Sequence, residues 1–227
     1  MCGRVAQFGT FREIVELLRW PGPAEERQQA DARYNIPPST LVKLLHAEGD
    51  TLIQDLVRWG WRPHWATDNR LPSNARVEKV AHSSYWRAIW PHRAVAPIEG
   101  WFEWVKDQDD PKKKLPFFIR RADGLPCLAA AIGQFPTGDQ EQREHDGCAI
   151  ITDEAAGGLV DVHDRRPVIL PAELVAEWLD PATRTERAEQ LLLQQSEPPE
   201  TFEWYRVSTE VNSSAHKGAQ LITSIER

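Results

Sequence analysis

The segment from Arg93 to Phe135 constrains the fold most strongly, because long apolar and aromatic runs alternate in it with short turn sequences. The runs AVAPIEGWFEWVK, KLPFFIRR and LPCLAAAIGQF predict strands, separated by DQDDPKKK and by Ala122-Asp123-Gly124. Further strands are expected at CAIIT and PVIL. Many strands of modest length with few crossover helices indicate an α+β fold, in which a mixed, mostly antiparallel sheet closes into a barrel-like core with flanking helices.

The N-terminal part of the chain adds one helix and one hairpin to this pattern. Thr10-Phe11-Arg12-Glu13 is a capping-box sequence and predicts a helix through Leu18. Leu41 to Leu45 and Thr51 to Trp59 predict two strands across a short turn. Two later helices are expected in AELVAEWL and RTERAEQLLLQQ. A chain of 227 residues without internal repeats is expected to form one domain over residues 1–227.

Charge and tryptophan content limit the class of partner. The formal net charge of -7 argues against binding of duplex nucleic acid through a broad positive surface. The first hundred residues nevertheless carry a slight excess of basic side chains, which is compatible with one local basic groove. Most of the ten tryptophans are expected in the core, where they bury large apolar areas.

The three cysteines, Cys2, Cys127 and Cys148, fit neither a metal-ligand spacing nor an even set of disulfides. Cys127 and Cys148 lie in apolar runs and are expected to be buried strand residues. We therefore expect no metal and no cofactor. The sequence has no secretory signal pattern and no apolar stretch of membrane-spanning length. These features predict a reduced, cytoplasmic protein without membrane contact.

Cys2 follows directly after Met1, and removal of Met1 would make it an N-terminal residue with a free amine and a thiol. Such an aminothiol captures aldehydes: the amine forms an imine, and the thiol then closes a five-membered thiazolidine ring in a favoured intramolecular step. The pKa of an α-amine is roughly 8 and that of a cysteine thiol roughly 8.5, so both groups react near neutral pH. Position alone is also compatible with a Cys2 that has no function.

Among the polar residues, Glu103 is the one whose sequence context fits an exposed surface position least well. In EGWFEWV, the period-2 alternation of a strand places Trp101, Glu103 and Val105 on one face and Phe102 and Trp104 on the other. A carboxyl group between large apolar neighbours should have a raised pKa, as a general acid or base needs. Taken singly, Asn74 fits a turn cap and His163 fits a structural histidine equally well.

Nine short strings resemble, in order and over almost the whole chain, the SRAP (SOS-response-associated peptidase) family. They are MCGR, RYNIPPS, WGW-P-WA, SNAR, EGWFEW, FFI, AIIT, HDRRPVIL and VSTEVN. The chain departs from the family pattern at Val77-Glu78-Lys79, at Phe102 and at Arg166. None of these departures removes a reactive group, whereas Lys79 and Arg166 bear on contacts with nucleic acid.

The resemblance implies a sensor of abasic sites that cross-links itself to single-stranded DNA and shields the lesion. In the family, the N-terminal cysteine traps the aldehyde of the ring-opened sugar as a thiazolidine. Transferred by motif, Cys2 would be the nucleophile, and Asn74 would hold the amine or the opened sugar. Glu103 would move protons during imine formation and ring closure. His163 would act on the sugar oxygen during ring opening or reversal, and lyase or autoproteolytic activity would accompany the imine chemistry.

The same resemblance suggests which residues bind the DNA strand. Guanidinium groups would contact the phosphates, and apolar side chains would stack against exposed bases or insert beside the lesion. These contacts would not depend on the base sequence. The candidates are Arg4, Arg33, Pro38, Arg58, Trp61, Arg76, Trp104 and Arg165. The expected partner is single-stranded DNA with abasic sites, and the protein is expected to be a monomer that is associated with the nucleoid when bound.

Two other functions remain open at this stage. The first is a thiol peptidase or amidohydrolase in which Cys2 attacks an amide, His163 or the α-amine acts as the base, and Asn74 stabilises an oxyanion. The second is a module that binds single strands without covalent chemistry. Peptide cleavage would identify the first, and DNA binding that is indifferent to Cys2→Ala would identify the second.

Overall fold

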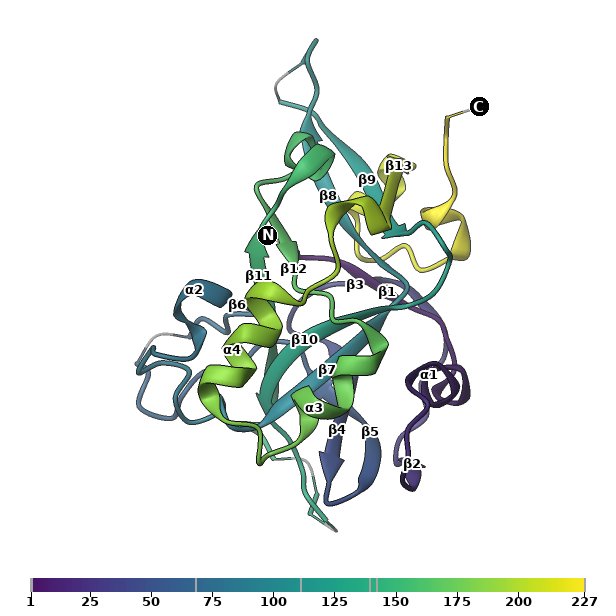
Figure 1. The fold of residues 1–227 in the computed structure, drawn as a ribbon. Coiled ribbons are helices and arrows are strands. Elements are labelled where there is room, and N and C mark those ends of the chain that lie inside the picture. The colour runs from purple at the N-terminus through teal and green to yellow at the C-terminus, as the bar shows by residue number, and fades with distance from the viewer. Residues whose placement is uncertain (1, 68, 111, 139, 142, 227) are drawn as a thin grey trace.

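The computed structural model describes residues 2–67, 69–110, 112–138, 140–141 and 143–226, which form two β-sheets with short helices around them (Figure 1). The smaller sheet has the order β13-β9-β8-β1-β3. All of its neighbouring strands are antiparallel. Its strands are β1 (Val5–Gln7), β3 (Arg33–Ile36), β8 (Gly100–Lys106), β9 (Lys114–Arg121) and β13 (Phe202–Arg206).

The larger sheet has the order β12-β11-β10-β7-β4-β5-β2, with β6 paired to β11 beside this path. Only the β2–β5 and β6–β11 pairs are parallel among the described residues. Its strands are β2 (Ala24–Glu26), β4 (Leu41–Glu48), β5 (Thr51–Arg58), β6 (Asn74–Arg76), β7 (Arg93–Ile98), β10 (Cys127–Gln134), β11 (Gly147–Glu154) and β12 (Arg165–Pro167).

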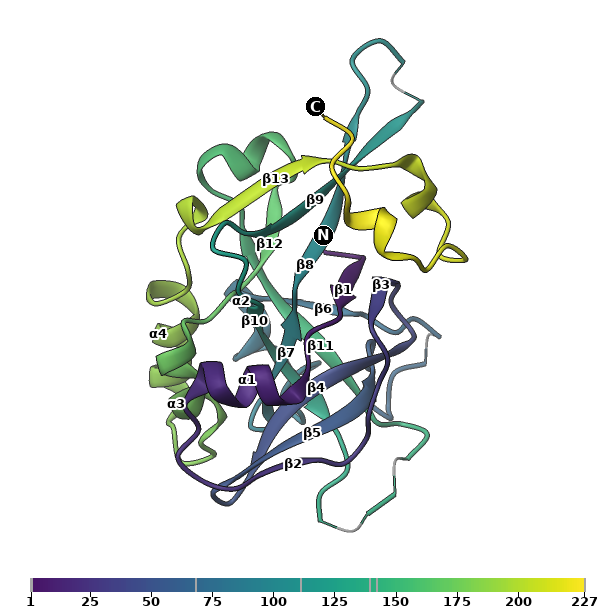
Figure 2. The ribbon, with the colours of Figure 1, turned by 90° about the vertical axis from the view of Figure 1, so that its right-hand side faces the viewer.

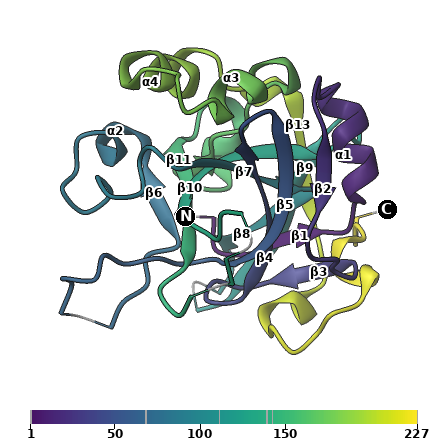
Figure 3. The ribbon, with the colours of Figure 1, turned by 90° about the horizontal axis from the view of Figure 1, so that it is seen from below.

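The helices are short and flank the sheets. Helix α1 has the predicted capping box, in which Thr10 accepts from the backbone N–H of Glu13 and the Glu13 carboxylate accepts from that of Thr10. The view from below shows α3 and α4 together on one side and α1 on another (Figure 3). The α-helices are α1 (Phe11–Leu18), α2 (Val77–Val80), α3 (Val175–Leu179) and α4 (Thr185–Gln194). The 3₁₀ turns are η1 (Gly157–Asp161), η2 (Ala172–Leu174), η3 (Pro199–Thr201), η4 (Thr209–Asn212) and η5 (Ala219–Ile222).

The α+β fold with mostly antiparallel sheets and flanking helices is therefore confirmed, but the sheets differ in detail from the expected barrel. Neither strand path closes on itself within the described residues. The run AVAPIEGWFEWVK is not one strand, because the chain leaves β7 at Ile98 and enters β8 of the other sheet at Gly100. Gly100 has no room for a side chain, since an added Cβ would collide with Phe118 and the carbonyl of Ile119.

The predicted PVIL strand is also displaced. The strand that pairs with β11 is Arg165–Pro167, which lies earlier in the chain than expected. The residues that follow it are held mainly by individual backbone hydrogen bonds to the neighbouring strands. Val168 donates to the carbonyl of Ile151, and Leu170 donates to that of Leu128. This segment crosses from one strand to another, so it joins two neighbours without running alongside either. No helix among the described residues has the length and apolar character to cross a membrane.

The strand alternation predicted around Glu103 is confirmed. Trp101 and Val105 pack in the cluster that contains Cys2, Cys127 and Cys148, whereas Phe102 and Trp104 pack in another. Cys127 and Cys148 are fully buried, as expected. The two clusters lie on opposite faces of β8, and Glu103 points to the face that contains Cys2.

Candidate functional site

Cys2 is fully buried and begins the described chain, three residues before β1, which pairs with β8. Burial raises the pKa of its thiol well above the ordinary value, and the charge of Glu103 raises it further. The backbone N–H of Arg4 forms a hydrogen bond with the sulfur and opposes this shift. The Cys2 thiol is therefore neutral at physiological pH in this environment, so it needs a base before it can act as a nucleophile.

Asn74 holds the backbone of Cys2. Its Nδ2 donates to the carbonyl oxygen of Cys2 at 2.7 Å. Asn74 begins β6, whose parallel pairing with β11 aligns it with Ile150 and fixes the direction of its side chain. Its Oδ1 is buried and accepts no hydrogen bond from the described residues. A buried amide oxygen without a donor is costly, so this atom is an acceptor available to a ligand.

Glu103 lies on β8 opposite Phe117 of β9, and only 3% of it is exposed. Burial raises the pKa of its carboxyl group to about 7, and the charge of Asp164 acts in the same direction. At neutral pH the group is thus present in both protonation states. A carboxyl group with this pKa can donate a proton in one step and accept one in the next.

His163 faces Glu103 from the turn between η1 and β12. Its Nε2 lies 3.7 Å from Oε2 of Glu103. Its Nδ1 accepts the backbone N–H of Arg165 at 2.9 Å, which places the proton of the neutral ring on Nε2. The 2.8 Å contact of Nδ1 with Asp164 instead requires a proton on Nδ1, which either the imidazolium or the other neutral tautomer supplies. Burial lowers the pKa of His163, which favours the neutral ring.

The structure brings the four predicted catalytic residues together from four separate parts of the chain. Asn74 contacts Cys2 directly, and the carboxyl group of Glu103 is close enough to shift the pKa of the Cys2 thiol. His163 joins this group through Glu103. No group of His, Cys, Asp and Glu that could hold a metal ion exists in the part of the chain that the structure describes.

Arg76 and Arg165 lie together beside this group. Arg76 is exposed, whereas Arg165 is buried and forms a bidentate ion pair with Glu78 at 2.6 and 2.9 Å. The pair lowers the pKa of Glu78 to about 2. Both arginines line a cavity of about 320 Å³, together with Glu78, Glu154, Ala155, Val160 and Asp164. Because Asp164 follows His163 in the chain, this cavity adjoins the turn that carries His163.

The other predicted arginines are anchored to backbone carbonyls. Arg4 donates to Val211 O, Arg33 to Leu41 O, and Arg58 to the carbonyls of Glu144 and Asp146. Pro38 is half-buried in the turn before β4. Trp104 is half-buried, and the guanidinium of Arg4 lies over its ring at 5.7 Å from the ring centre. The indole N–H of Trp104 donates a hydrogen bond to the side-chain oxygen of Asn212.

Trp61 and Trp65 have opposite environments. Only 2% of Trp61 is exposed, and its ring packs against Tyr85 and Trp86 in the core. Trp65, which the sequence reasoning missed, is 55% exposed and contacts the same Tyr85 with an edge-on ring. Its polar neighbours His64 and Thr67 were the available signal. Of these two rings, only that of Trp65 can meet a base without a rearrangement.

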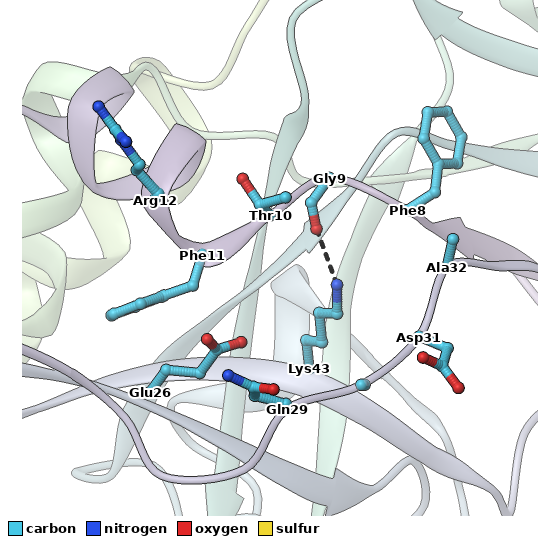
Figure 4. Close-up of a pocket in the computed structure, with 11 residues that line it drawn as sticks. Phe8, Gly9, Thr10, Phe11, Arg12, Glu26, Gln29, Asp31, Ala32 and Lys43 are labelled. Carbon is cyan, nitrogen blue, oxygen red and sulfur yellow. Dashed lines mark hydrogen bonds between the residues drawn. The ribbon is translucent and has the colours of Figure 1, made fainter.

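A second cavity, of about 440 Å³, lies at the far end of β1 from Cys2, next to the start of α1 (Figure 4). Lys43 extends into it and donates to the carbonyl of Gly9 at 2.7 Å. Arg12 adds a second cation to its lining, while Glu26 and Asp31 add two carboxylates. This balance favours neither an anionic nor a cationic ligand.

The sequence matches the family described as SOS response associated peptidase (SRAP) over residues 1–214. It is similar to abasic site processing protein YedK of Escherichia coli (strain K12), with 39% identity over 233 residues that cover 99% of this chain and 100% of the relative. Abasic site processing protein YoqW of Bacillus subtilis (strain 168) is 31% identical over 229 residues, again covering 99% of this chain and 100% of the relative.

Solved structures show the same architecture. A phage-related protein from Bordetella bronchiseptica matches with a TM-score of 0.77 and 38% identity, covering 92% of this chain and 95% of that one. A protein from Bacteroides thetaiotaomicron has a TM-score of 0.77 at 18% identity, covering 98% and 99% of the two chains. The second likeness concerns the fold alone.

Proposed function

The chain belongs to the SOS-response-associated peptidase (SRAP) family, and from that premise we propose that it processes abasic sites in DNA. Its relatives at 39% and 31% identity are named for this process. We further propose that Cys2, once Met1 is removed, forms a thiazolidine cross-link with an abasic site in single-stranded DNA and so shields the lesion. The observation that carries this proposal is the convergence of Asn74 and the Glu103–His163 pair on Cys2.

The proposed chemistry releases one water and needs several proton transfers, two of which we assign to Glu103. The α-amine of Cys2 attacks the aldehyde carbon of the ring-opened sugar and gives a carbinolamine. Its hydroxyl group leaves as water after protonation, and the C=N bond of an imine forms. The sulfur then attacks the imine carbon, a C–S bond forms, and the thiol proton ends on the nitrogen. The thiazolidine and one water account for every atom of the aldehyde and the aminothiol.

Glu103 has the protonation behaviour that both transfers require. With a pKa of about 7, its acid form can protonate the leaving hydroxyl group, and its carboxylate can accept the proton of the Cys2 thiol. Burial keeps that thiol neutral, so its proton must be accepted as the C–S bond forms. Asn74 Oδ1 would accept an N–H of the amine or a hydroxyl of the opened sugar. His163, as a neutral ring with a proton on Nε2, would serve the sugar oxygen.

We propose that the strand is held by cationic and aromatic side chains around this centre. Arg76 and Arg165 would meet phosphates at the cavity beside His163, and Trp65 would stack on a base. The remaining candidates are Arg4, Arg33, Pro38, Arg58 and Trp104. Trp61 would support Trp65 through Tyr85 and not contact the strand itself. Such contacts do not depend on base identity, so flanking sequence should matter little.

The test is the intact mass of purified protein before and after incubation with an abasic single-stranded oligonucleotide. Protein that begins with Cys2 should gain the mass of the oligonucleotide minus one water and keep it under denaturing conditions. Cys2→Ala should not form this stable product, and an N-terminal extension should block it while leaving DNA affinity nearly intact. A processed wild-type protein that forms no adduct would refute the proposal, and unchanged DNA binding by such a protein would identify a non-covalent module.

A thiol peptidase is less well supported by the site. That mechanism needs a thiolate at rest, which an adjacent cationic histidine usually provides. Here burial and Glu103 raise the pKa of the Cys2 thiol, and the pKa of His163 is lowered. A neutral thiol that attacks last, after an imine has formed, fits these shifts better than a thiolate that attacks first.

A further inference from the structure

The end of the chain folds back onto its beginning. Residues 207–225, here called the C-terminal strap, lie beside β1 and β3 (Figure 2, Figure 3). Val207, Val211 and Leu221 of the strap are fully buried, and Ile225 donates to the carbonyl of Arg206. The family match ends at residue 214, so the second half of the strap is packed structure beyond that match.

One buried side chain connects the strap to the N-terminal segment. Asn35 of β3 is 2% exposed, and its Oδ1 accepts from Nη1 of Arg4 at 2.6 Å. Its Nδ2 donates to the carbonyls of Ser213 at 3.0 Å and His216 at 2.9 Å, with a longer contact of 3.4 Å to Val211 O. The amide thus uses its acceptor for Arg4 and its donors for the strap.

Arg4 is anchored at one end of its guanidinium group. Nη1 donates to Asn35 and, at 2.9 Å, to Val211 O, and the group lies over the ring of Trp104. A guanidinium has five N–H donors. Nε and Nη2 of Arg4 have no acceptor among the described residues. The backbone N–H of the same residue is close enough to the Cys2 sulfur to oppose the rise in the pKa of the thiol, so Arg4 also neighbours the nucleophile.

We propose that Asn35 is a positioning residue that orients Arg4 for a DNA phosphate by fastening it to the C-terminal strap. The inference rests on the proposed function, because it assigns Arg4 to the phosphate contact. With Nη1 held by Asn35, the Nη2 end of the group is left for a phosphate oxygen. Arginine side chains lose much rotational freedom on binding, and a group that is already fixed loses less.

The test is a double-mutant cycle on binding of a fluorescent single-stranded oligonucleotide that has no abasic site. Arg4→Ala should weaken binding and reduce the slope of log Kd against log salt by about 0.7, the value for one phosphate on a single strand. Asn35→Ala should weaken binding about tenfold in the wild-type background, which is typical of losing a hydrogen bond to a charged group. In the Arg4→Ala background, Asn35→Ala should change binding less than about twofold.

Gln7→Ala is the matched control. Gln7 is also a buried amide of the N-terminal segment, with hydrogen bonds of 2.8 to 3.0 Å to Lys43 and Pro97, and none of its side-chain hydrogen bonds within the described residues involves Arg4. Its effect on DNA binding should be equal in the wild-type and Arg4→Ala backgrounds, whatever it costs in stability. If Asn35→Ala behaves like Gln7→Ala in the cycle, the role of Asn35 is only structural and the inference is wrong.

Asn35→Asp separates the two halves of the amide. The carboxylate keeps the acceptor for Arg4 but turns an oxygen toward the carbonyls of Ser213 and His216. The new negative charge beside Arg4 should weaken DNA binding at low salt, and this loss should shrink as salt screens the charge, while proteolysis within the strap becomes faster. A loss at high salt as large as that of Asn35→Ala would overturn the inference. Wild-type protein that binds DNA and shows the coupling but forms no abasic adduct would instead refute the proposed function alone.

Discussion

Nε2 of His163 lies 3.7 Å from Oε2 of Glu103, and the opposite ring nitrogen accepts the backbone N–H of Arg165. The backbone donor favours the neutral tautomer whose Nε2 proton points at the carboxyl group, whereas the 2.8 Å contact of Nδ1 with Asp164 favours a proton on Nδ1. The pKa of Glu103 is raised to about 7, whereas burial lowers the pKa of His163 below its ordinary value, so near neutral pH the carboxyl group exchanges its proton while the ring is neutral. The centre can accept or release a proton at little cost.

Glu103→Gln should slow formation of the covalent adduct by at least about 100-fold, because general acid–base catalysis typically contributes that much. The amide keeps the shape of the side chain but cannot exchange a proton. The wild-type rate should change around pH 7, where Glu103 titrates, and the variant should show no transition there. Single-turnover adduct yields on denaturing gels across pH 5.5 to 8.5 measure both effects, and an unchanged rate would remove Glu103 from the chemistry.

The same substitution should stabilise the protein at alkaline pH. Glu103 has a folded-state pKa of about 7 against 4.5 when exposed, so its stabilising contribution is full below pH 4.5 and is lost as pH rises through 7. The difference corresponds to roughly 3 kcal/mol at most. Urea unfolding at pH 5 and pH 8 should therefore show wild type losing more stability than Glu103→Gln. An equal loss in both proteins would contradict the raised pKa.

Glu78→Gln should affect stability in the opposite pH range. The pKa of Glu78 is lowered to about 2 by Arg165, so its contribution is present above the ordinary value and is lost as pH falls toward 2. The Glu78 side chain is 42% exposed, so solvent screening limits the contribution to below about 1 kcal/mol. The unfolding midpoints of wild type and Glu78→Gln should differ at pH 6 and come closer together at pH 3. A constant difference would show that the pair does not titrate as described.

Trp65→Ala and Trp61→Ala should separate binding from stability. Loss of the exposed ring of Trp65 should weaken single-strand binding roughly tenfold and leave the unfolding midpoint nearly unchanged, since stacking on one base contributes about 1–3 kcal/mol. Loss of the buried ring of Trp61 should cost about 3–5 kcal/mol of stability. Fluorescence anisotropy and thermal unfolding measure the two effects, and the reverse pattern would reassign the stacking role to Trp61.

Local sequence patterns predicted much of the fold because they report on local geometry. The capping box of α1 and the alternation of Trp101, Glu103 and Val105 follow from helix and strand periodicity, and both are confirmed. The change of sheet between Ile98 and Gly100 has no such signal, because both strands read as one apolar run. Only the close packing of Gly100 against Phe118 of β9 marks the break.

The candidate site was predictable where the chemistry of a residue conflicted with its surroundings, as for Glu103 in an apolar strand. Exposure was harder to predict. Trp61 and Trp65 share one short motif, and only tertiary packing against Tyr85 and Trp86 decides which ring is buried. Asn35 lies within the motif RYNIPPS, but its role was not predictable, because its partners Arg4 and Ser213 lie far from it in the sequence. Contacts of this kind follow from topology and not from composition.

The hydrogen bonds between the N-terminal segment and the C-terminal strap have a consequence during synthesis. Arg4 depends on the carbonyl of Val211, and the amide that orients it depends on His216. A ribosome adds Val211 at 207 residues after Arg4 and His216 at 181 residues after Asn35, so these particular hydrogen bonds form only after those later residues have been made. If Met1 is removed during that interval, as the proposed function requires, the removal precedes the contacts that hold the N-terminal segment over Cys2.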